Sequence, residues 1–263
     1  MIHVLINGAT GRMGSEVVRS VLQEEGLDIV AAVDPGAAGK DLGEALGMGN
    51  MGITIDPSLK EAFDKVNPDV VVDFTTPEVI FENARFVLEK GTNIVIGTTG
   101  LTAEQRDELS EISRRTGANG LVAPNFSLGA VLLMKTAAEI ARYMPDAEII
   151  ELHHNHKYDA PSGTAKLTAE KMAAARIKEP EKDGTKESIS GVRGGKYKGI
   201  TIHSVRLPGY VAHQEVLFGG YGEILTLRHD SLDRKSFMPG VMLACKKCMK
   251  VKGFVYGLEN YLE

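Results

Sequence analysis

Short apolar runs rich in valine and isoleucine alternate with longer segments of helical periodicity through the first half of the chain. The runs predict strands at 2–7, 28–33, 70–73, 93–96 and 119–122. The segments between them predict helices at 12–25, 78–90 and 102–116. Strands without polar alternation are typical of a sheet that is covered on both faces. We therefore expect an α/β domain built on a parallel, doubly wound sheet.

The pattern changes after about residue 145. The segments that follow are a strand at 147–152, a helix at 163–175, strands at 200–206, 211–218 and 222–228, and a helix at 233–250. Pro208-Gly209 and the glycines at 219–222 separate the last three strands and predict hairpins, hence antiparallel pairing. The hydrophilic stretch from Lys178 to Lys198 is interpreted as a surface loop. We expect a second, α+β domain inserted before a closing helix.

Composition narrows the possible partners. The 263 residues include 30 Lys+Arg and 35 Asp+Glu, a formal charge of −5, so a nucleic-acid partner is not expected. Two cysteines cannot form a disulfide framework, and the C-x-x-C pair Cys245 and Cys248 lies in a predicted helix, where packing is the simpler interpretation. The N-terminus has no secretion signal, and no apolar run reaches the ~18 residues of a membrane span. We expect a cytoplasmic protein with no membrane partner.

A glycine-rich turn, Gly8-Ala9-Thr10-Gly11-Arg12-Met13-Gly14, directly follows the first predicted strand and opens the first predicted helix. In that context glycines let the backbone approach a pyrophosphate, and the free N–H groups of the helix start bind it. The common dinucleotide fingerprint has glycine where this chain has Ala9. A purely structural turn is therefore the alternative.

Asp34 supports the dinucleotide interpretation because it ends the second predicted strand, 20 residues after Gly14, where an acid can bind the adenosine ribose hydroxyls. The alternative is a turn residue before Pro35. A carboxylate at this position repels a 2′-phosphate, which favours NADH over NADPH. Arg12 and Lys40 could offset the repulsion and leave both cofactors open.

Three of the seven histidines, His153, His154 and His156, fall within four residues. A metal site is the weaker interpretation, because Lys157 follows directly and the helical spacing of zinc ligands is missing. We therefore predict no metal. An anion-binding and proton-transfer site fits better, with His153 and Lys157 as candidate proton donors.

The turn Pro161-Ser162-Gly163-Thr164 precedes a predicted helix just beyond this cluster. Ser162 and Thr164 can cap the helix, while the backbone N–H groups of Gly163 and Thr164 face a carboxylate. The alternative is a polar loop with a capped helix and no ligand.

Together these motifs resemble the 4-hydroxy-tetrahydrodipicolinate reductases, historically called dihydrodipicolinate reductases. The resemblance covers nearly the whole chain and is carried by the glycine turn, Asp73-Phe74-Thr75, Gly97-Thr98-Thr99-Gly100, Asn125-Phe126-Ser127 and the block from His153 to Ala165. It implies a Rossmann-like dinucleotide-binding domain at 1–124 and 235–263. It also implies a mixed-sheet domain at 125–234 that binds substrate and builds a homotetramer.

The activity implied by the resemblance is hydride transfer from NADH or NADPH to a cyclic 2,6-dicarboxylate with loss of water, in lysine and diaminopimelate biosynthesis. The cofactor contacts that it implies are Gly8, Ala9, Thr10, Gly11, Arg12, Met13, Asp34, Gly97, Thr98, Thr99, Ala123, Pro124, Asn125, Phe126 and, on a looser alignment, Arg234. The proton donors are then His153 and Lys157, and the substrate contacts are His154, Ser162, Gly163 and Thr164.

Two positions depart from the family pattern. Pro35 stands where NADPH-competent relatives often carry arginine, and Thr76 replaces a cation of some members. Both departures favour NADH. The alternatives to this function are a reductase or dehydrogenase of another amino-dicarboxylic acid, and a nucleotide-sensing protein without turnover.

Overall fold

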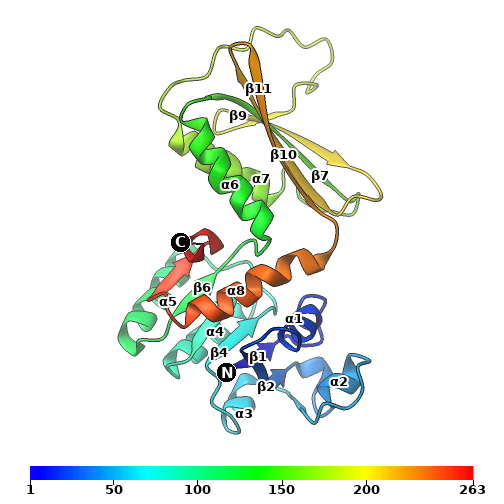
Figure 1. Ribbon diagram of the computed structural model, residues 1–263, viewed down its shortest axis with the longest axis vertical. Coiled ribbons are helices and arrows are strands. Elements are labelled where there is room, and N and C mark those ends of the chain that lie inside the picture. The colour runs from blue at the N-terminus through cyan, green and yellow to red at the C-terminus, as the bar shows by residue number, and fades with distance from the viewer. Residues whose placement is uncertain (263) are drawn as a thin grey trace. The chain divides into compact units, whose positions relative to one another are not determined.

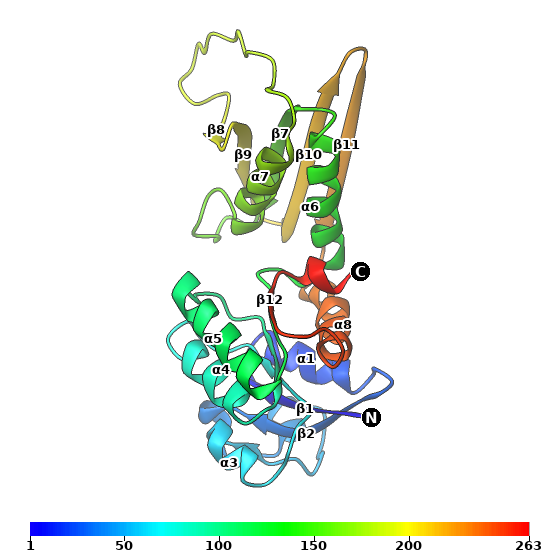
Figure 2. The same ribbon diagram turned by 90° about the vertical axis from the view of Figure 1, so that its left-hand side faces the viewer.

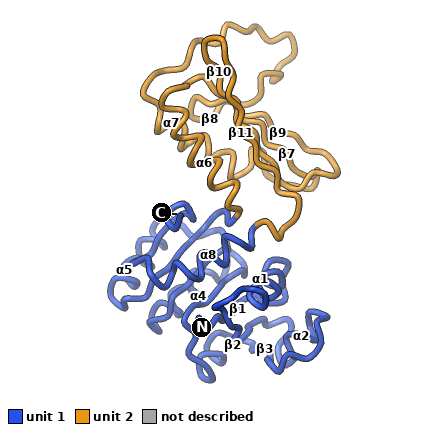
Figure 3. The backbone as a smooth tube through the Cα atoms, viewed as in Figure 1, with its two compact units in different colours: residues 1–126, 237–263 blue, residues 127–236 orange. Residues whose placement is uncertain are grey.

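The computed structural model, shown in Figures 1 and 2, describes residues 1–262. The chain forms two compact units, coloured separately in Figure 3. Unit 1 contains Met1–Phe126 and the segment that begins at Phe237, and unit 2 contains Ser127–Ser236. Among the described residues, none of the helices combines the length and apolar character needed to cross a membrane.

Unit 1 is built on a parallel sheet in the order β12-β6-β5-β4-β1-β2-β3. Its strands are β1 (Ile2–Asn7), β2 (Leu27–Val33), β3 (Ile55–Asp56), β4 (Val70–Asp73), β5 (Asn93–Ile96), β6 (Gly120–Val122) and β12 (Phe254–Tyr256). Its helices are α1 (Gly14–Val21), α2 (Leu42–Ala45), α3 (Leu59–Phe63), α4 (Ile80–Glu89), α5 (Ala103–Thr116) and α8 (Met238–Cys248), with short 3-10 turns η1 (Pro35–Ala37) and η3 (Leu258–Tyr261).

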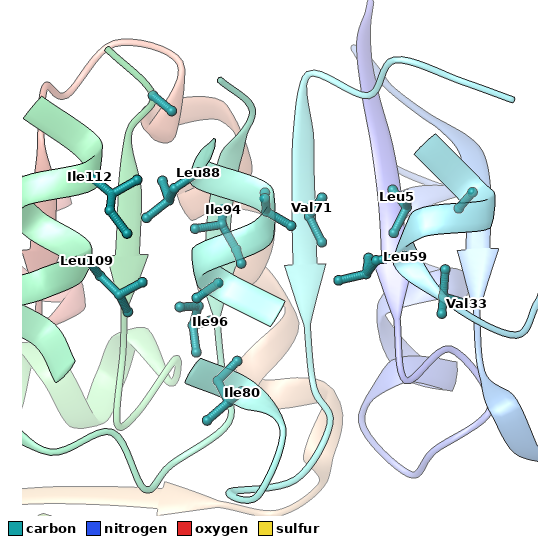
Figure 4. Packing of buried hydrophobic residues seen from close by; sticks show 14 of the residues in the cluster. Leu5, Val33, Leu59, Val71, Ile80, Leu88, Ile94, Ile96, Leu109 and Ile112 are labelled. Atoms are coloured by element: carbon teal, nitrogen blue, oxygen red, sulfur yellow. The ribbon is translucent and has the colours of Figure 1, made fainter. Parts of the chain in front are cut away.

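Helices cover both faces of this sheet. On one face, apolar side chains of α3, α4 and α5 pack on the strands, as Figure 4 shows for Leu59, Leu88 and Leu109 against Val71 and Ile94. Helices α1 and α8 contact each other and the strands as well. Val70, Val71 and Val72 are fully buried, as expected for a strand without solvent on either side. The predicted α/β class with a parallel, doubly wound sheet is confirmed.

Unit 2 contains a mixed sheet in the order β11-β10-β7-β9-β8. Its strands are β7 (Asp146–His153), β8 (Gly195–Tyr197), β9 (Ile200–Arg206), β10 (Ala212–Gly220) and β11 (Glu223–Ser231). Its helices are α6 (Leu128–Ala141) and α7 (Gly163–Ala175), and the short turn η2 (Arg234–Phe237) begins at its end. Buried side chains of α6 and α7 pack on one face of the sheet, against residues that include Ile149, Val216 and Phe218.

One of the two predicted hairpins is wrong. Strands β10 and β11 do pair antiparallel around Tyr221-Gly222, but β9 and β10 are not neighbours, because β7 lies between them. The chain runs from β7 through α7 to β9, which makes a strand–helix–strand crossover and pairs β9 parallel to β7. The Pro208-Gly209 turn therefore carries the chain past the central strand.

Helix α6 is absent from the sequence-based expectations. Its residues from Ala130 to Met134 are almost continuously apolar, so they show little helical periodicity. Elements of two to five residues, such as β3 and α3, were missed because they are too short to show a period.

The packing interpretation of the cysteines is confirmed. Cys245 and Cys248 are free, buried thiols in α8. Burial raises the pKa of the Cys248 thiol to about 11, so the neutral form predominates at neutral pH.

Candidate active site

The glycine turn lies between β1 and α1, at the carboxyl end of the parallel strands. Sheet order reverses between β1 and β4, and ligands of open α/β sheets bind at such a switch point. Gly8 has φ +80°, and a Cβ there would lie 2.5 Å from the Phe74 carbonyl oxygen. A Cβ on Gly14 would lie 2.0 Å from the Gly8 carbonyl oxygen. The turn therefore needs glycine at both positions.

The start of α1 fits a dinucleotide pyrophosphate. No side chain caps this helix, and among the described helices the same holds for α4, α6 and α8, whereas Ser162 caps α7 and Thr102 caps α5. An uncapped helix start leaves backbone N–H groups for an anionic ligand. The residues present are therefore compatible with the cofactor that the sequence predicts.

Asp34 lies against the glycine turn. Its Oδ2 accepts hydrogen bonds from the Thr10 backbone N–H at 2.9 Å and from the Thr10 hydroxyl at 2.5 Å. Its Oδ1 accepts from the Gly36 N–H at 3.1 Å, at the start of η1. The turn-residue interpretation thus holds, and the same carboxylate also contacts the glycine turn. Its contact with a ribose stays a prediction.

A buried carboxylate, Asp73, connects the strand ends around this turn. Asp73 is fully buried at the end of β4. Its oxygens accept hydrogen bonds from the Asn7 and Asn83 side-chain amides (2.7 and 3.0 Å), the Thr75 backbone N–H and hydroxyl (3.0 and 2.7 Å) and the Thr98 hydroxyl (3.0 Å). Asp73 therefore fixes the ends of β1 and β4 and the loop after β5.

The remaining predicted cofactor residues of unit 1 follow β5 and β6. A Cβ on Gly97 would lie 2.0 Å from the Phe74 ring, and that ring lies 5.8 Å from the Phe126 ring, centroid to centroid. Ala123 and Phe126 are buried, while Pro124 and Thr99 are exposed. Arg234 belongs to η2, in unit 2, and is exposed.

In unit 2, the predicted proton donor His153 is the last residue of β7. Its Nδ1 lies 2.5 Å from Oε2 of Glu151, two residues earlier on the same face of the strand. Arg206, opposite His153 in β9, donates to both oxygens of Glu151 (2.8 and 2.7 Å). The Ser162 backbone N–H also donates to Glu151, at 3.3 Å.

These contacts keep Glu151 ionised. Complete burial by itself would raise the pKa of the carboxyl, but hydrogen bonds from His153, Arg206 and Ser204 outweigh it and lower the pKa to about 2. A carboxylate can only accept hydrogen bonds, so the proton between the two groups belongs to His153 Nδ1. The opposite ring nitrogen, Nε2, is then the atom that can exchange a proton.

Lys157, the second predicted donor, is three-quarters buried and forms an ion pair with Asp159, with 2.6 Å between Nζ and Oδ1. The hydrogen bond from Lys157 lowers the pKa of Asp159. Arg206 donates to the Asp159 carbonyl oxygen at 2.8 Å, so the turn that carries Asp159 is attached to the Glu151 cluster.

The start of α7 has the predicted cap. Ser162 is buried, and its Oγ accepts from the Ala165 N–H at 3.2 Å. Gly163 is exposed, and a Cβ on it would have no neighbour within 4 Å. His154 is exposed, with its ring 6.4 Å from that of His156. Among residues 1–262, no cluster of three His, Cys, Asp or Glu side chains is placed to hold a metal ion.

Sequence reasoning missed the roles of Glu151, Arg206, Asp159 and Asp73. Glu151 could have been noticed, because it stands two residues before His153 in a predicted strand and must share its face. Arg206 lies 55 residues beyond Glu151 in the sequence, and only the β7–β9 register brings the two together.

The parallel sheet with a glycine turn at its switch point defines a Rossmann-like dinucleotide-binding protein. Two family models, described as the N-terminus and the C-terminus of dihydrodipicolinate reductase, match residues 2–126 and 129–262. The chain therefore belongs to the dihydrodipicolinate reductase family.

Individual relatives agree with this assignment. A 4-hydroxy-tetrahydrodipicolinate reductase of Moorella thermoacetica is 50% identical over 263 residues, which cover 100% of this chain and 98% of the relative. One from Listeria welshimeri is 48% identical over 264 residues and 100% of both chains. A dipicolinate-bound dihydrodipicolinate reductase from Paenisporosarcina sp. TG-14 superimposes with a TM-score of 0.88 at 44% identity and covers 99% of each chain.

Gly163→Ala tests whether the start of α7 receives a ligand. The new methyl group has no neighbour within 4 Å, so the midpoint of thermal unfolding should stay the same or rise slightly. If a substrate carboxylate approaches the Gly163 N–H, the methyl group should raise the KM for substrate, by roughly tenfold for a loss of about 1.4 kcal/mol. Steady-state kinetics and thermal unfolding measure the two effects. An unchanged KM would mean that the ligand does not approach this backbone.

Proposed function

We propose that this protein is a 4-hydroxy-tetrahydrodipicolinate reductase, which reduces its cyclic dicarboxylate substrate with loss of water at the expense of NADH or NADPH. The observation that carries the proposal is the presence of His153, Lys157 and the exposed Gly163 at the start of α7 in a chain 50% identical to a named reductase. We further propose that it acts in the cytoplasm, where reduced nicotinamide cofactors are held, which cell fractionation would test.

Unit 1 would hold the dinucleotide. The backbone of Gly8 to Met13 and the N–H groups of α1 bind the pyrophosphate, and Asp34 binds the adenosine ribose. The loops at Gly97–Thr99 and Ala123–Phe126 would flank the nicotinamide, and the family resemblance adds Arg234, a residue of unit 2, as a further cofactor contact. When bound, the reduced nicotinamide supplies the hydride.

Unit 2 would bind the substrate. A dianion needs more than one cationic or N–H-rich partner. Lys157 provides a positive charge, His154 provides a ring N–H donor, and Gly163 and Thr164 provide backbone N–H groups. The Ser162 hydroxyl accepts from Ala165 and can still donate its own proton to a carboxylate. The Paenisporosarcina relative was solved with dipicolinate, a planar dicarboxylate, and this supports a dicarboxylate as the ligand.

His153 and Lys157 supply the proton that the reaction requires. Loss of the hydroxyl as water leaves a carbon–carbon double bond in the ring. Hydride addition to one of its carbons would place negative charge on the other, which a positioned acid must protonate. His153 can deliver a proton from Nε2, while Nδ1 stays bound to Glu151. Substrate carboxylates would compete with Asp159 for the Lys157 ammonium.

The function is tested with substrate generated from pyruvate and aspartate semialdehyde. We expect the wild-type protein to oxidise reduced cofactor in its presence, and His153→Ala or Lys157→Ala to lower kcat by about 10²–10⁴-fold. Binding of NADH, titrated separately, should change little. Near-full turnover in both variants would contradict the proton-donor roles. Turnover only with another dicarboxylate, or binding of NADH without any turnover, would identify a different reductase or a sensor.

We propose that NADH is the preferred cofactor. The Asp34 carboxylate lies at the glycine turn and would repel a 2′-phosphate, and Pro35 provides no compensating charge. The double variant Asp34→Ala with Pro35→Arg should raise kcat/KM for NADPH relative to NADH. Pro35→Arg alone is the control that keeps the Thr10 hydrogen bonds. An unchanged ratio in the double variant would show that this strand end does not contact the ribose.

We also propose a homotetramer assembled through unit 2. On the sheet face opposite α6 and α7, the apolar side chains of Ile150, Leu152, Val205, Leu217 and Ile224 are partly or largely exposed. Exposed apolar side chains gathered on a sheet face without a covering helix favour an interface. Light scattering should give about four times the chain mass of 28.3 kDa, and Leu217→Lys should reduce it. A monomeric wild-type protein would contradict the proposal.

A further inference from the structure

Strand β7 carries two carboxylates that each bind one histidine and one arginine. Glu151 binds His153 and Arg206, as described above. Glu148 binds His203, with 2.7 Å between Oε2 and Nε2, and forms an ion pair with Arg193. Since the two glutamates are three residues apart, they lie on opposite faces of the sheet. Strand β7 therefore carries two carboxylate–histidine–arginine clusters, one beside the candidate site and one on the opposite face of the sheet.

The surroundings of the two glutamates differ. Glu151 is fully buried, whereas the Glu148 side chain keeps 31% of its surface exposed. A buried carboxylate is costly unless it is paired and hydrogen-bonded, while an exposed ion pair contributes little. Because an unpaired charge at Glu151 would be costly, its contacts with His153 and Arg206 are strongly favoured.

Three parts of the candidate site converge on Glu151. The first is the His153 ring, through Nδ1. The second is the start of α7, through the Ser162 N–H at 3.3 Å. The third is the turn before α7, because Arg206 bridges Glu151 to the Asp159 carbonyl. One carboxylate thus fixes the proton donor and the carboxylate-binding helix start relative to each other.

We propose that Glu151 and Arg206 are positioning residues for the reduction. Glu151 holds His153 in the tautomer with the proton on Nδ1 when the ring is neutral, so that Nε2 faces the ligand. Arg206 keeps the carboxylate paired and attaches the Asp159 turn to it. The inference rests on the proposed function, because it assigns these residues to the work of His153.

Glu151→Gln is the informative substitution. The glutamine amide has one oxygen, which accepts the hydrogen bonds of Arg206. Its NH₂ group is then directed at the His153 imidazole. His153 should therefore change from the Nδ1–H to the Nε2–H tautomer. Nitrogen NMR of protein labelled at histidine detects this change without cofactor or substrate, and a His153→Gln sample assigns the signal.

Turnover provides the second readout. We expect Glu151→Gln to lower kcat by roughly tenfold or more, since the ring that donates from Nε2 must also carry a proton on Nδ1, and an amide NH₂ directed at Nδ1 opposes that doubly protonated form. The KM for NADH should stay the same. Arg206→Lys keeps one charge but loses the two-point contact, and should give an intermediate kcat. Glu148→Gln is the matched control, and should keep both the His153 tautomer and kcat within about twofold.

Several outcomes would overturn the proposal. One is a Glu151→Gln protein with wild-type tautomer and turnover, and another is an equal loss of kcat in Glu148→Gln at unchanged oligomeric mass. A changed His153 tautomer with full turnover in Glu151→Gln would also contradict the proposed role of Glu151 in the reaction. If Glu151→Gln does not fold, Glu151→Asp retains the charge with a shorter reach, and an unaltered kcat there would count against the proposal. Full activity of His153→Ala would instead refute the proposed proton donor, while the NMR result still reports on Glu151.

Discussion

A buried carboxylate governs the architecture of unit 2. Glu151 has no solvent contact, so its charge must be balanced within the protein. Arg206 and His153 provide that balance only because β9 pairs parallel to β7 and places Arg206 opposite His153. The parallel pairing in turn needs the α7 crossover, whose first residues contact the same carboxylate. Strand order, helix start and site chemistry are therefore parts of a single electrostatic arrangement.

Unit 1 also contains a buried carboxylate, but its hydrogen-bond donors are of a different kind. Asp73 is equally buried, but the hydrogen bonds described for it come from neutral amides, hydroxyls and a backbone N–H. These donors come from the ends of adjacent strands and from α4, so the carboxylate acts as a joint between loops. In unit 2 the partners of Glu151 include a cationic side chain, Arg206, and a titratable one, His153, beside the neutral Ser162 N–H. The difference follows from the donors available, not from the depth of burial.

The sequence was most informative where structure is local. Strands β1, β4 and β5 were predicted to the residue, because continuous valine and isoleucine runs end sharply at polar positions. Helix α7 and its Ser162 cap were predicted from an equally local signal, the turn Pro161-Ser162-Gly163-Thr164 at the helix start. The β9–β10 hairpin failed because a turn signal shows where a chain bends and not which strand lies beside it. His153 and Lys157 were found as neighbours in sequence, whereas Arg206 depends on long-range register.

The position of Asp34 links two properties that sequence alone treats separately. Its carboxylate anchors Thr10 of the glycine turn and begins η1, and it also provides the negative charge next to the proposed ribose site. A lineage that adapts to a phosphorylated cofactor by losing this charge therefore also loosens the glycine turn, which we propose binds the pyrophosphate. Selection for a new nucleotide must then restore the anchor by other residues, so a change of specificity at this strand end requires concerted substitutions.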